Sequence, residues 1–103
     1  MSRVVVSPQA EADLAQIVDD VSVKAGAAVA ERLFDRIVAI VERLSVAPKM
    51  SGRLVPALGE GVRCHPIGSY NVYLRHDESG DVLFVVRVLH GRRNITAARF
   101  GTE

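Results

Sequence analysis

Hydrophobic and polar positions divide the 103-residue chain into a helical first half and a strand-rich second half. Within residues 8–45, apolar side chains recur every three or four positions, the spacing that places them on one face of a helix. Within residues 62–90, they alternate with polar residues or form a continuous run, as in half-buried and fully buried strands. Residues 3–6, Arg-Val-Val-Val, are mostly β-branched and indicate a short strand before the helices.

The first helix is predicted to begin at Ser7 and Pro8 and to end at Gly26. The serine hydroxyl can accept a hydrogen bond from a free amide at the helix start, and proline suits the first helical position because its missing N–H is not needed there. Glycine often ends helices because it adopts left-handed backbone angles without strain. A second helix is predicted over about residues 27–45, before Pro48, since the residue preceding a proline avoids helical angles.

The second helix carries a wide apolar stripe. Its main row contains Val29, Leu33, Ile37, Ile40, Val41 and Leu44, and Phe34 and Val38 widen it. A stripe of this width can serve two surfaces, the sheet on one side and the first helix or a partner protein on the other. The alternative interpretation is that the whole stripe belongs to the internal core.

The second half is predicted to form three strands after a loop over residues 48–61. Residues 62–67 contain Pro66, which fits an edge strand or a bend because proline cannot donate to a strand ladder. Residues 70–75 alternate, whereas residues 82–90 are almost entirely apolar, which indicates a central strand buried on both faces. The predicted fold class is α+β: an N-terminal strand, a helical hairpin and a three-stranded antiparallel meander, with the helices on one face of the sheet.

Length and cysteine content narrow the class of protein. A single domain spanning residues 1–103 is expected from the length. Cys64 is the one cysteine in the sequence, so no intramolecular disulfide can form, and a reducing cytoplasm is the natural location. We recognise no signal peptide, and no apolar run approaches the roughly 20 residues of a membrane span. A cytoplasmic protein with no membrane partner is therefore expected.

Charge is distributed unevenly along the chain, although the net charge is only +1. Residues 1–47 contain five Lys or Arg against seven Asp or Glu, and residues 48–103 contain eight against five. Residues 82–102 contain no acid and four arginines, Arg87, Arg92, Arg93 and Arg99. Such a basic segment favours an anionic partner, either nucleic acid or an acidic protein segment. A solvated surface without a partner is the alternative.

Few residue patterns point to catalysis or metal binding. His65, His76 and His90 lie far apart in the sequence, and no Cys or His pair has the spacing of metal ligands. Neither a glycine-rich phosphate loop nor a nucleophile elbow is present. Cys64 is interpreted as a small buried apolar residue. We therefore predict no metal and no cofactor.

One cluster of basic residues remains as candidate chemistry. It comprises Arg53, Arg63, Arg75, Arg87, His90, Arg92 and Arg93, most of them on or just after the predicted strands. Arginine forks bind phosphates or carboxylates through paired hydrogen bonds, so the cluster could hold an RNA backbone or the acidic residues of a protein. For Arg87 alone, the alternative is a structural salt bridge, to Asp13 or Asp19.

Several segments, in the right order and spacing, resemble the ParE family of toxins. Residues 4–14, Val-Val-Val-Ser-Pro-Gln-Ala-Glu-Ala-Asp-Leu, resemble the family's opening strand, its turn and its Ala-x-x-Asp-Leu helix start. Gly26 lies where the family separates its two helices. The most specific segment is residues 87–94, Arg-Val-Leu-His-Gly-Arg-Arg-Asn. The resemblance implies the RelE/ParE-like fold and a toxin of a type II toxin–antitoxin system.

The resemblance also implies a cognate ParD-like antitoxin, whose C-terminal segment wraps the toxin's helical hairpin and sheet. We predict a partner with a DNA-binding N-terminal part and an amphipathic, acidic C-terminal part. Its site is predicted along the second helix and the basic face, at Leu33, Phe34, Ile37, Val41, Arg75 and Arg87.

Two activities occur in the superfamily: ParE toxins inhibit DNA gyrase and trap it on DNA, and their RelE relatives are ribosome-dependent mRNA endonucleases. In a nuclease, Arg63, Arg87, His90 and Arg93 would carry the reaction. The family's middle-strand arginine is replaced here by Tyr70 or Asn71, and the tail has Phe100, which cannot act as acid or base.

We therefore expect a gyrase inhibitor that acts by binding and is not an enzyme. Its predicted target-binding residues are Arg87, His90, Arg92, Arg93 and Arg99. The alternatives are a RelE-type nuclease acting on mRNA at the ribosome, and an inactive homologue that still binds antitoxin.

Overall fold

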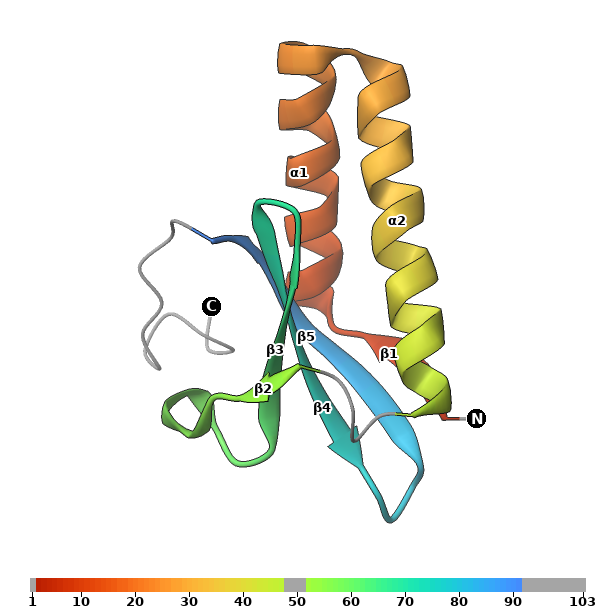
Figure 1. Cartoon of the computed structure of the whole chain (residues 1–103), viewed down its shortest axis with the longest axis vertical. Coiled ribbons are helices and arrows are strands. Elements are labelled where there is room, and N and C mark those ends of the chain that lie inside the picture. Colours follow the sequence, from red (N-terminus) through yellow and green to blue (C-terminus); the bar gives the residue numbers. More distant parts are fainter. Residues whose placement is uncertain (1, 48–51, 92–103) are drawn as a thin grey trace.

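A hairpin of two helices packs on one face of a five-stranded mixed sheet (Figure 1). The computed structural model describes residues 2–47 and 52–91. The elements are β1 (Arg3–Val6), α1 (Pro8–Ala25), α2 (Ala27–Val46), β2 (Arg53–Leu54), the short 3-10 helix η2 (Pro56–Leu58), β3 (Val62–Ile67), β4 (Tyr70–Asp77) and β5 (Val82–His90). Among the described residues, no helix is long and apolar enough to cross a membrane.

The predicted α+β class is confirmed, and the sheet has one strand more than predicted. Its order is β1-β5-β4-β3-β2, with β1 parallel to β5 and the other neighbours antiparallel. The additional strand β2 and the helix η2 lie inside the segment predicted to be a loop. Strand β2 pairs only through Arg53 with Cys64 and Leu54 with Arg63, so it is too short to leave a periodic pattern in the sequence.

Strand positions agree with the patterns that predicted them. The apolar strand β5 lies inside the sheet between β1 and β4. Strand β3 has β2 on its outer side only at Arg63 and Cys64, so Pro66 occupies a stretch with no outer strand among the described residues. The missing amide of this proline therefore costs no ladder hydrogen bond on that side.

Both helix ends follow from their residues. The Ser7 hydroxyl accepts a hydrogen bond from the Ala10 amide at 3.0 Å, as predicted for the cap of α1. Gly26 has φ of 96°, in the region that favours glycine, and it separates α1 from α2. The tip of the hairpin extends beyond the sheet (Figure 1), and Val23 near this tip is 87% exposed.

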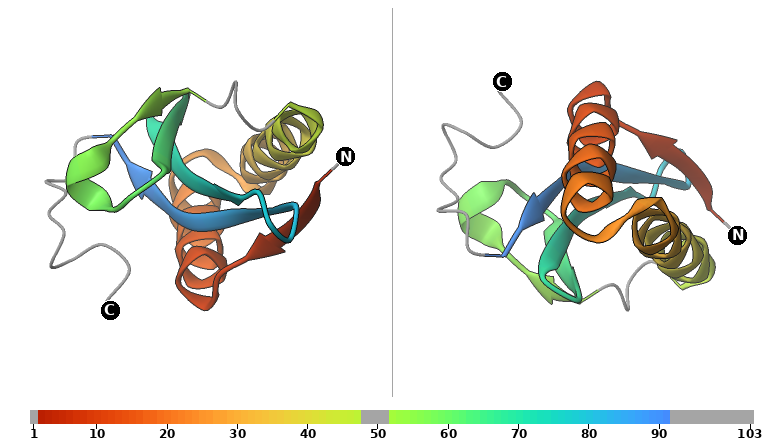
Figure 2. Two further views of the ribbon diagram at one scale, coloured as in Figure 1. Left: turned by 90° about the horizontal axis from the view of Figure 1, so that it is seen from below. Right: turned by 90° about the horizontal axis from the view of Figure 1, so that it is seen from above.

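The main core lies between the helices and the sheet. The end-on views show how the two helices and the strands are arranged (Figure 2). It contains Ile37, Val41 and Leu44 of α2, whereas Phe34 and Val38 of the same helix stay exposed. The interpretation that all of the wide stripe is core is therefore wrong, and a partner for its exposed residues stays a prediction. A helix can turn only about a third of its circumference toward one neighbour, so the flanking apolar residues stay outside.

The opposite face of the sheet carries a second, smaller apolar cluster. Its buried members are Val62, Cys64, Tyr73 and Leu89, and the segment containing β2 and η2 packs on it through Val55 and Leu58. Short irregular segments can therefore cover a sheet face that has no helix.

The start of the chain is held to the β4–β5 turn by a small polar cluster. The amide of buried Ser2 donates to the Ser45 carbonyl at 2.8 Å, and the Ser2 hydroxyl donates to Asp81 Oδ1 at 2.6 Å. His76 Nε2 lies 3.1 Å from the same carboxylate oxygen. The Ser2 hydroxyl, followed by His76, holds the pKa of Asp81 below its ordinary value.

Substitution of Asp81 by asparagine is expected to lower stability at neutral pH. A carboxyl with a lowered pKa in the folded state stabilises the fold while it is ionised, and that stability is lost as the pH falls through its folded pKa. The free energy of unfolding in urea should therefore differ between the parent and Asp81→Asn at pH 7. The difference should shrink once the pH falls well below about 3.9, the ordinary value for aspartate. A constant difference across this pH range would contradict an electrostatic role.

Candidate functional site

The first candidate site lies where β1 ends and the edge of β5 would otherwise be unpaired. Beyond Val6, the start of α1 takes over the hydrogen bonds of β5. The Ser7 amide donates to the Val85 carbonyl at 3.0 Å, and the Ser7 hydroxyl donates to the Val86 carbonyl at 2.7 Å. The same hydroxyl caps α1, so one serine joins strand, turn and helix.

Asp13 and Arg87 form a buried two-point ion pair at this junction, which we call the Asp13–Arg87 clamp. Arg87 Nε donates to Asp13 Oδ2 at 2.8 Å, and Nη2 donates to Oδ1 at 3.0 Å. The Val88 amide also donates to Asp13 Oδ2 at 3.0 Å. Only 10% of the arginine side chain and 11% of the aspartate side chain are exposed. The structural interpretation of Arg87 is thus confirmed, with Asp13 rather than Asp19 as its partner.

Burial of Arg87 changes its role in the predicted sites. It was assigned to target binding, antitoxin binding and a possible nuclease centre, all of which require a guanidinium directed at a partner. Its fork instead holds α1 to β5. A backbone irregularity explains why the Arg87 side chain is directed at Asp13. The register between β4 and β5 shifts at Tyr73/Leu74, and Arg87 comes directly after this shift, on the stretch of β5 that β1 does not cover.

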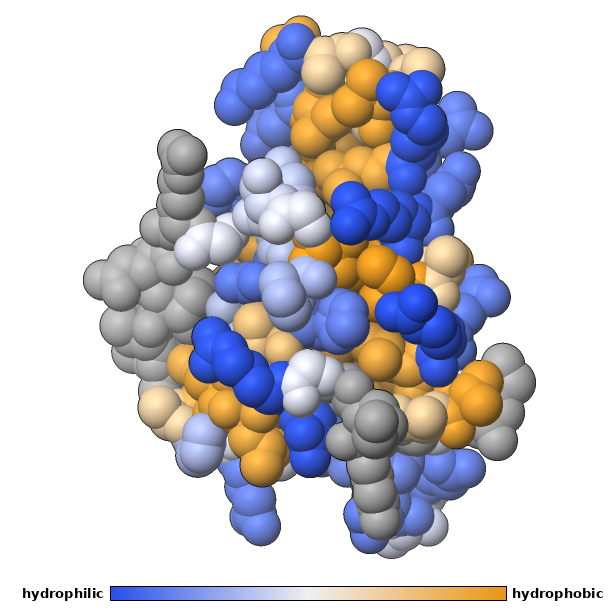
Figure 3. Space-filling view, viewed as in Figure 1, coloured by the Kyte–Doolittle hydropathy of each residue, from blue (hydrophilic) through white to orange (hydrophobic). Residues whose placement is uncertain are grey.

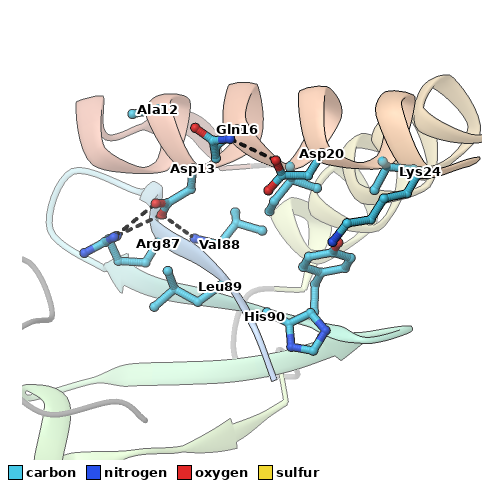
Figure 4. Close-up of a pocket in the computed structure, with 12 residues that line it drawn as sticks. Ala12, Asp13, Gln16, Asp20, Lys24, Arg87, Val88, Leu89 and His90 are labelled. Carbon is cyan, nitrogen blue, oxygen red and sulfur yellow. Dashed lines mark hydrogen bonds and ion pairs between the residues drawn. The ribbon is translucent and has the colours of Figure 1, made fainter. Parts of the chain in front are cut away.

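A groove of about 380 Å³ runs between α1 and the ends of β4 and β5, beside the clamp (Figure 4). Asp13, Gln16, Asp20 and Lys24 of α1 form one wall, and Tyr70, Arg87, Val88, Leu89 and His90 form the other. The His90 ring meets the Tyr70 ring edge-on, with centroids 5.3 Å apart. His90 is the last residue of the largely buried strand β5, and its own side chain is exposed. This groove therefore offers a polar surface to a partner.

Of the four residues proposed for a nuclease, the structure describes Arg63, Arg87 and His90; Arg87 and His90 line the polar groove, and Arg63 lies apart from it. Arg63 is opposite Leu74 and His90 is opposite Tyr70, so they are separated by four residues of β4, about 13 Å along the strand. Arg63 Nη1 instead donates to the Gly52 carbonyl at 3.4 Å. Arg92, Arg93 and Arg99 lie outside the described residues.

Arg75 also lies apart from the groove. Its guanidinium carbon lies 4.8 Å from the centroid of the Phe84 ring, on the sheet face away from the helices. This contact resembles a cation–π pair at an exposed site. Arg75 and Arg87 are on neighbouring strands, as predicted, but they serve different faces.

Two titratable residues of the smaller apolar cluster, Cys64 and Tyr73, present neutral side chains. Burial is the main cause that raises the pKa of the Cys64 thiol and of the Tyr73 hydroxyl, so both are protonated at neutral pH. Cys64 is buried, as its interpretation as a small apolar residue requires. Within residues 2–47 and 52–91, no group of three or more His, Cys, Asp or Glu could hold a metal ion.

The second candidate site is an apolar groove between α1 and α2, on the flank of α2 that carries Phe34. Two adjoining hollows of about 560 and 400 Å³ share Val18 and Phe34, and together we call them the interhelical groove. The first is also lined by Val6, Glu11, Leu14, Ala15 and Asp19, and the second by Ser22, Ala27, Ala30 and Glu31. Phe34 is 40% exposed, the unfavourable state for a large aromatic ring without a partner.

The predicted antitoxin site shares only Phe34 with this groove. Ile37 and Val41 are 3% and 7% exposed and belong to the core, and Leu33 packs against the core. The prediction that these residues line a surface groove is therefore corrected by their burial. Leu14 and Val18 were missed as lining residues, although they lie four positions apart on α1, the spacing of one helix face. The spacing of Leu14 and Val18 predicts that they share one buried face of α1. It does not show that the neighbouring helix leaves part of this face uncovered.

Comparison with known proteins agrees with this architecture. A family model described as ParE toxin of type II toxin–antitoxin system, parDE, matches residues 4–95. Toxin ParE3 of Caulobacter vibrioides is 31% identical over 97 residues, which are 94% of each chain. A chain of the chromosomal ParDE toxin–antitoxin system from P. aeruginosa superposes with a TM-score of 0.73 and 27% identity, over 87% of this chain and 96% of that chain.

A more distant structure shares the fold. A chain of the toxin–antitoxin complex RelBE2 from Mycobacterium tuberculosis superposes with a TM-score of 0.59 and 20% identity, over 86% of this chain and 96% of that chain. The helical hairpin on a mixed sheet is thus the fold of the ParE/RelE toxins. The chain belongs to the ParE family of toxins from type II toxin–antitoxin systems, and the resemblance seen in residues 4–14 and 87–94 is confirmed.

Proposed function

We propose that this toxin inhibits DNA gyrase by binding it, without chemistry of its own, and that a ParD-like antitoxin neutralises it. The observation that carries the first part is the state of the candidate nuclease residues. Arg87 is held inside the fold by Asp13, and Arg63 and His90 stand about 13 Å apart along β4. General acid–base catalysis needs its groups within hydrogen-bond reach of one reacting centre, and the separation of Arg63 from His90 argues against their acting as such a pair.

On this proposal, the polar groove beside the clamp is the surface that contacts gyrase. His90 is exposed at its mouth, and the strand containing His90 leads directly into the segment of Arg92 and Arg93. Exposed basic groups steer a protein toward an acidic or DNA-bound partner. A gyrase inhibitor must reach the chromosome, so a cytoplasmic location of the toxin is part of the same proposal.

Purified toxin is expected to inhibit gyrase-dependent supercoiling of relaxed plasmid and to accumulate trapped cleavage complexes. The double variant His90→Ala/Arg93→Ala should weaken inhibition, because it removes two charged or polar contacts while leaving the clamp in place. Gel electrophoresis of the plasmid, with and without detergent and protease, measures both effects. Unchanged supercoiling at a large excess of folded toxin would reject gyrase as the target.

The RelE-type alternative makes a different prediction in the same cells. Mapping of transcript ends after induction would show cuts in phase with codons, and Arg93→Ala would abolish them without unfolding the protein. Intact transcripts together with inhibited gyrase support the binding toxin. Normal growth after induction without antitoxin would instead indicate the third possibility, an inactive homologue that only binds antitoxin.

For the antitoxin we propose the interhelical groove as the principal docking site. The ParDE and RelBE2 structures are toxin–antitoxin complexes, which supports a partner of this kind. The groove has an apolar floor around Val18 and Phe34 and an acidic rim of Glu11, Asp19 and Glu31. An amphipathic helix laid in such a groove buries apolar anchors and suits Lys or Arg at its margins. The acidic part predicted for the antitoxin would therefore lie elsewhere on the toxin.

A further inference from the structure

Helix α2 carries charges of opposite sign on its two flanks. Arg32, Arg36 and Arg43 are spaced by four and seven residues, so they lie within about 40° of one another around the helix axis. Glu31, Asp35 and Glu42 each lie about 100° or more around the axis from Arg36, on the side that carries Phe34. The acidic flank borders the interhelical groove, where Glu31 is a lining residue. The other flank forms a separate basic surface.

The arginine flank faces β3. A Cβ atom at Gly68, in the β3–β4 turn, would lie 3.6 Å from Arg36 Nη1. Arg63 and His65 of β3 are opposite Leu74 and Val72, two residues of the core beneath the helices, so their side chains rise on the same side of the sheet as α2. We call Arg32, Arg36, Arg43, Arg63 and His65 the α2–β3 basic face. Strongly hydrophilic side chains run down α2 and over the β2–β3 region on this face of the molecule (Figure 3).

The basic groups of this face are not neutralised by the rest of the described chain. Arg32, Arg36 and Arg43 are exposed and form no hydrogen bond or ion pair with any residue in the described ranges. Arg63 contacts only a carbonyl, and the buried Nδ1 atom of His65 has no hydrogen-bond partner there. Arg32 and Arg36 are one helical turn apart, so their charges repel one another, and a bound anion would offset this repulsion.

We propose that the α2–β3 basic face binds the phosphate backbone of DNA. From Arg32 to Arg43 the row is about 16 Å long, eleven residues at a rise of about 1.5 Å. A DNA strand passes several phosphates over this length, at about 3.4 Å of helix axis each. Guanidinium forks bind phosphate oxygens in pairs, which favours four arginines over lysines for this purpose.

The choice of DNA over an acidic polypeptide rests on the proposed function, because a protein bound to gyrase lies beside DNA. The two flanks of α2 then have separate partners. The acidic rim of the interhelical groove repels DNA and accepts a protein segment, and the basic face holds DNA that gyrase has engaged. The toxin would then contact both gyrase and the DNA that gyrase has engaged, and it would slow the separation of the two.

Fluorescence anisotropy with a short labelled DNA duplex and the toxin alone tests the proposal. With four phosphate contacts, affinity should fall about a hundredfold between about 50 and 200 mM salt, since each contact contributes about −0.9 to the slope of log affinity against log salt. Arg36→Ala/Arg43→Ala should reduce that slope by about 2. The matched control Arg3→Ala/Arg75→Ala removes the same net charge from exposed positions outside the face, and it should keep the parental slope.

Three outcomes would overturn the proposal. The first is an equal salt slope in the two double variants. The second is binding that depends on Arg92 and Arg93 and not on Arg36 and Arg43. The third is displacement of the duplex by polyglutamate of matched charge more effectively than by unlabelled DNA. The last outcome would assign the face to an acidic protein segment. The anisotropy experiment contains no gyrase, so its result is independent of the supercoiling assay. DNA binding by this face can be absent while the toxin still inhibits supercoiling, and it can be present while gyrase is unaffected.

Discussion

Replacement of Asp13 by alanine is expected to destabilise the protein by about 3–5 kcal/mol, the cost of leaving one charge of a buried ion pair without its partner. Asp13 accepts three hydrogen bonds, two from Arg87 and one from the Val88 amide. The substitution would therefore remove the carboxylate that faces a guanidinium 90% buried, and with it the acceptor of the Val88 amide at the strand edge. Urea unfolding followed by circular dichroism measures the effect, which is large compared with the total stability of a domain of this size.

Matched variants separate the clamp from a general effect of charge. Asp20→Ala, on the same helix, removes an exposed carboxylate bound only by Gln16 within the described residues, so its effect should stay within about 0.5 kcal/mol. Arg87→Met combined with Asp13→Ala removes both charges, and it should cost much less than Asp13→Ala alone because no buried charge remains. A change below about 1 kcal/mol for Asp13→Ala would place the pair among ordinary surface ion pairs.

The clamp also explains why two distant motifs carried the family resemblance. The Asp of the helix start and the Arg of the last strand are 74 residues apart in sequence and in direct contact in the fold. Together they close the gap left where β1 ends, which gives both residues a role in the architecture of the fold. Motifs of this kind are reliable markers of a fold and weak indicators of chemistry.

Local patterns predicted the elements well because each depends on neighbouring residues. The Ser7 cap, the Gly26 stop and the apolar strand β5 follow from periodicity and backbone preference. Strand β2 could not be predicted, because two residues form it and its partner is supplied by β3. The choice between Asp13 and Asp19 was open for the same reason: only the position of β5 decides it.

The surface sites depended on information that hydrophobicity does not contain. Ile37 and Phe34 are both apolar and three residues apart, yet one is in the core and the other lines a groove. The difference comes from the direction in which α1 and the sheet approach α2. Similarly, the arginines of the α2–β3 basic face are scattered in sequence and are gathered only by helical turns and by the β3–β4 turn beside Arg36.

Phe34→Asp is expected to abolish stable binding of the antitoxin while leaving the toxin folded. The ring is 40% exposed at the junction of the two hollows of the interhelical groove, so it loses little packing within the toxin when replaced. In a complex it would be a central aromatic anchor, the kind of residue whose loss costs at least about 2 kcal/mol, a decrease in affinity of about thirtyfold. The added carboxylate would stand in the apolar floor of the groove and be buried as a charge under the partner.

Val23→Asp provides the control for this experiment. It introduces the same carboxylate at an 87% exposed position near the hairpin tip that lines neither hollow of the groove. Coexpression of each variant with the antitoxin, purification through a tag on the antitoxin, and titration calorimetry compare the two affinities, and urea unfolding confirms that both toxins are folded. If Phe34→Asp keeps the parental affinity, the interhelical groove is not the antitoxin site. If both variants lose affinity equally, the effect arises from charge and not from Phe34, because only one of them alters the apolar floor of the groove.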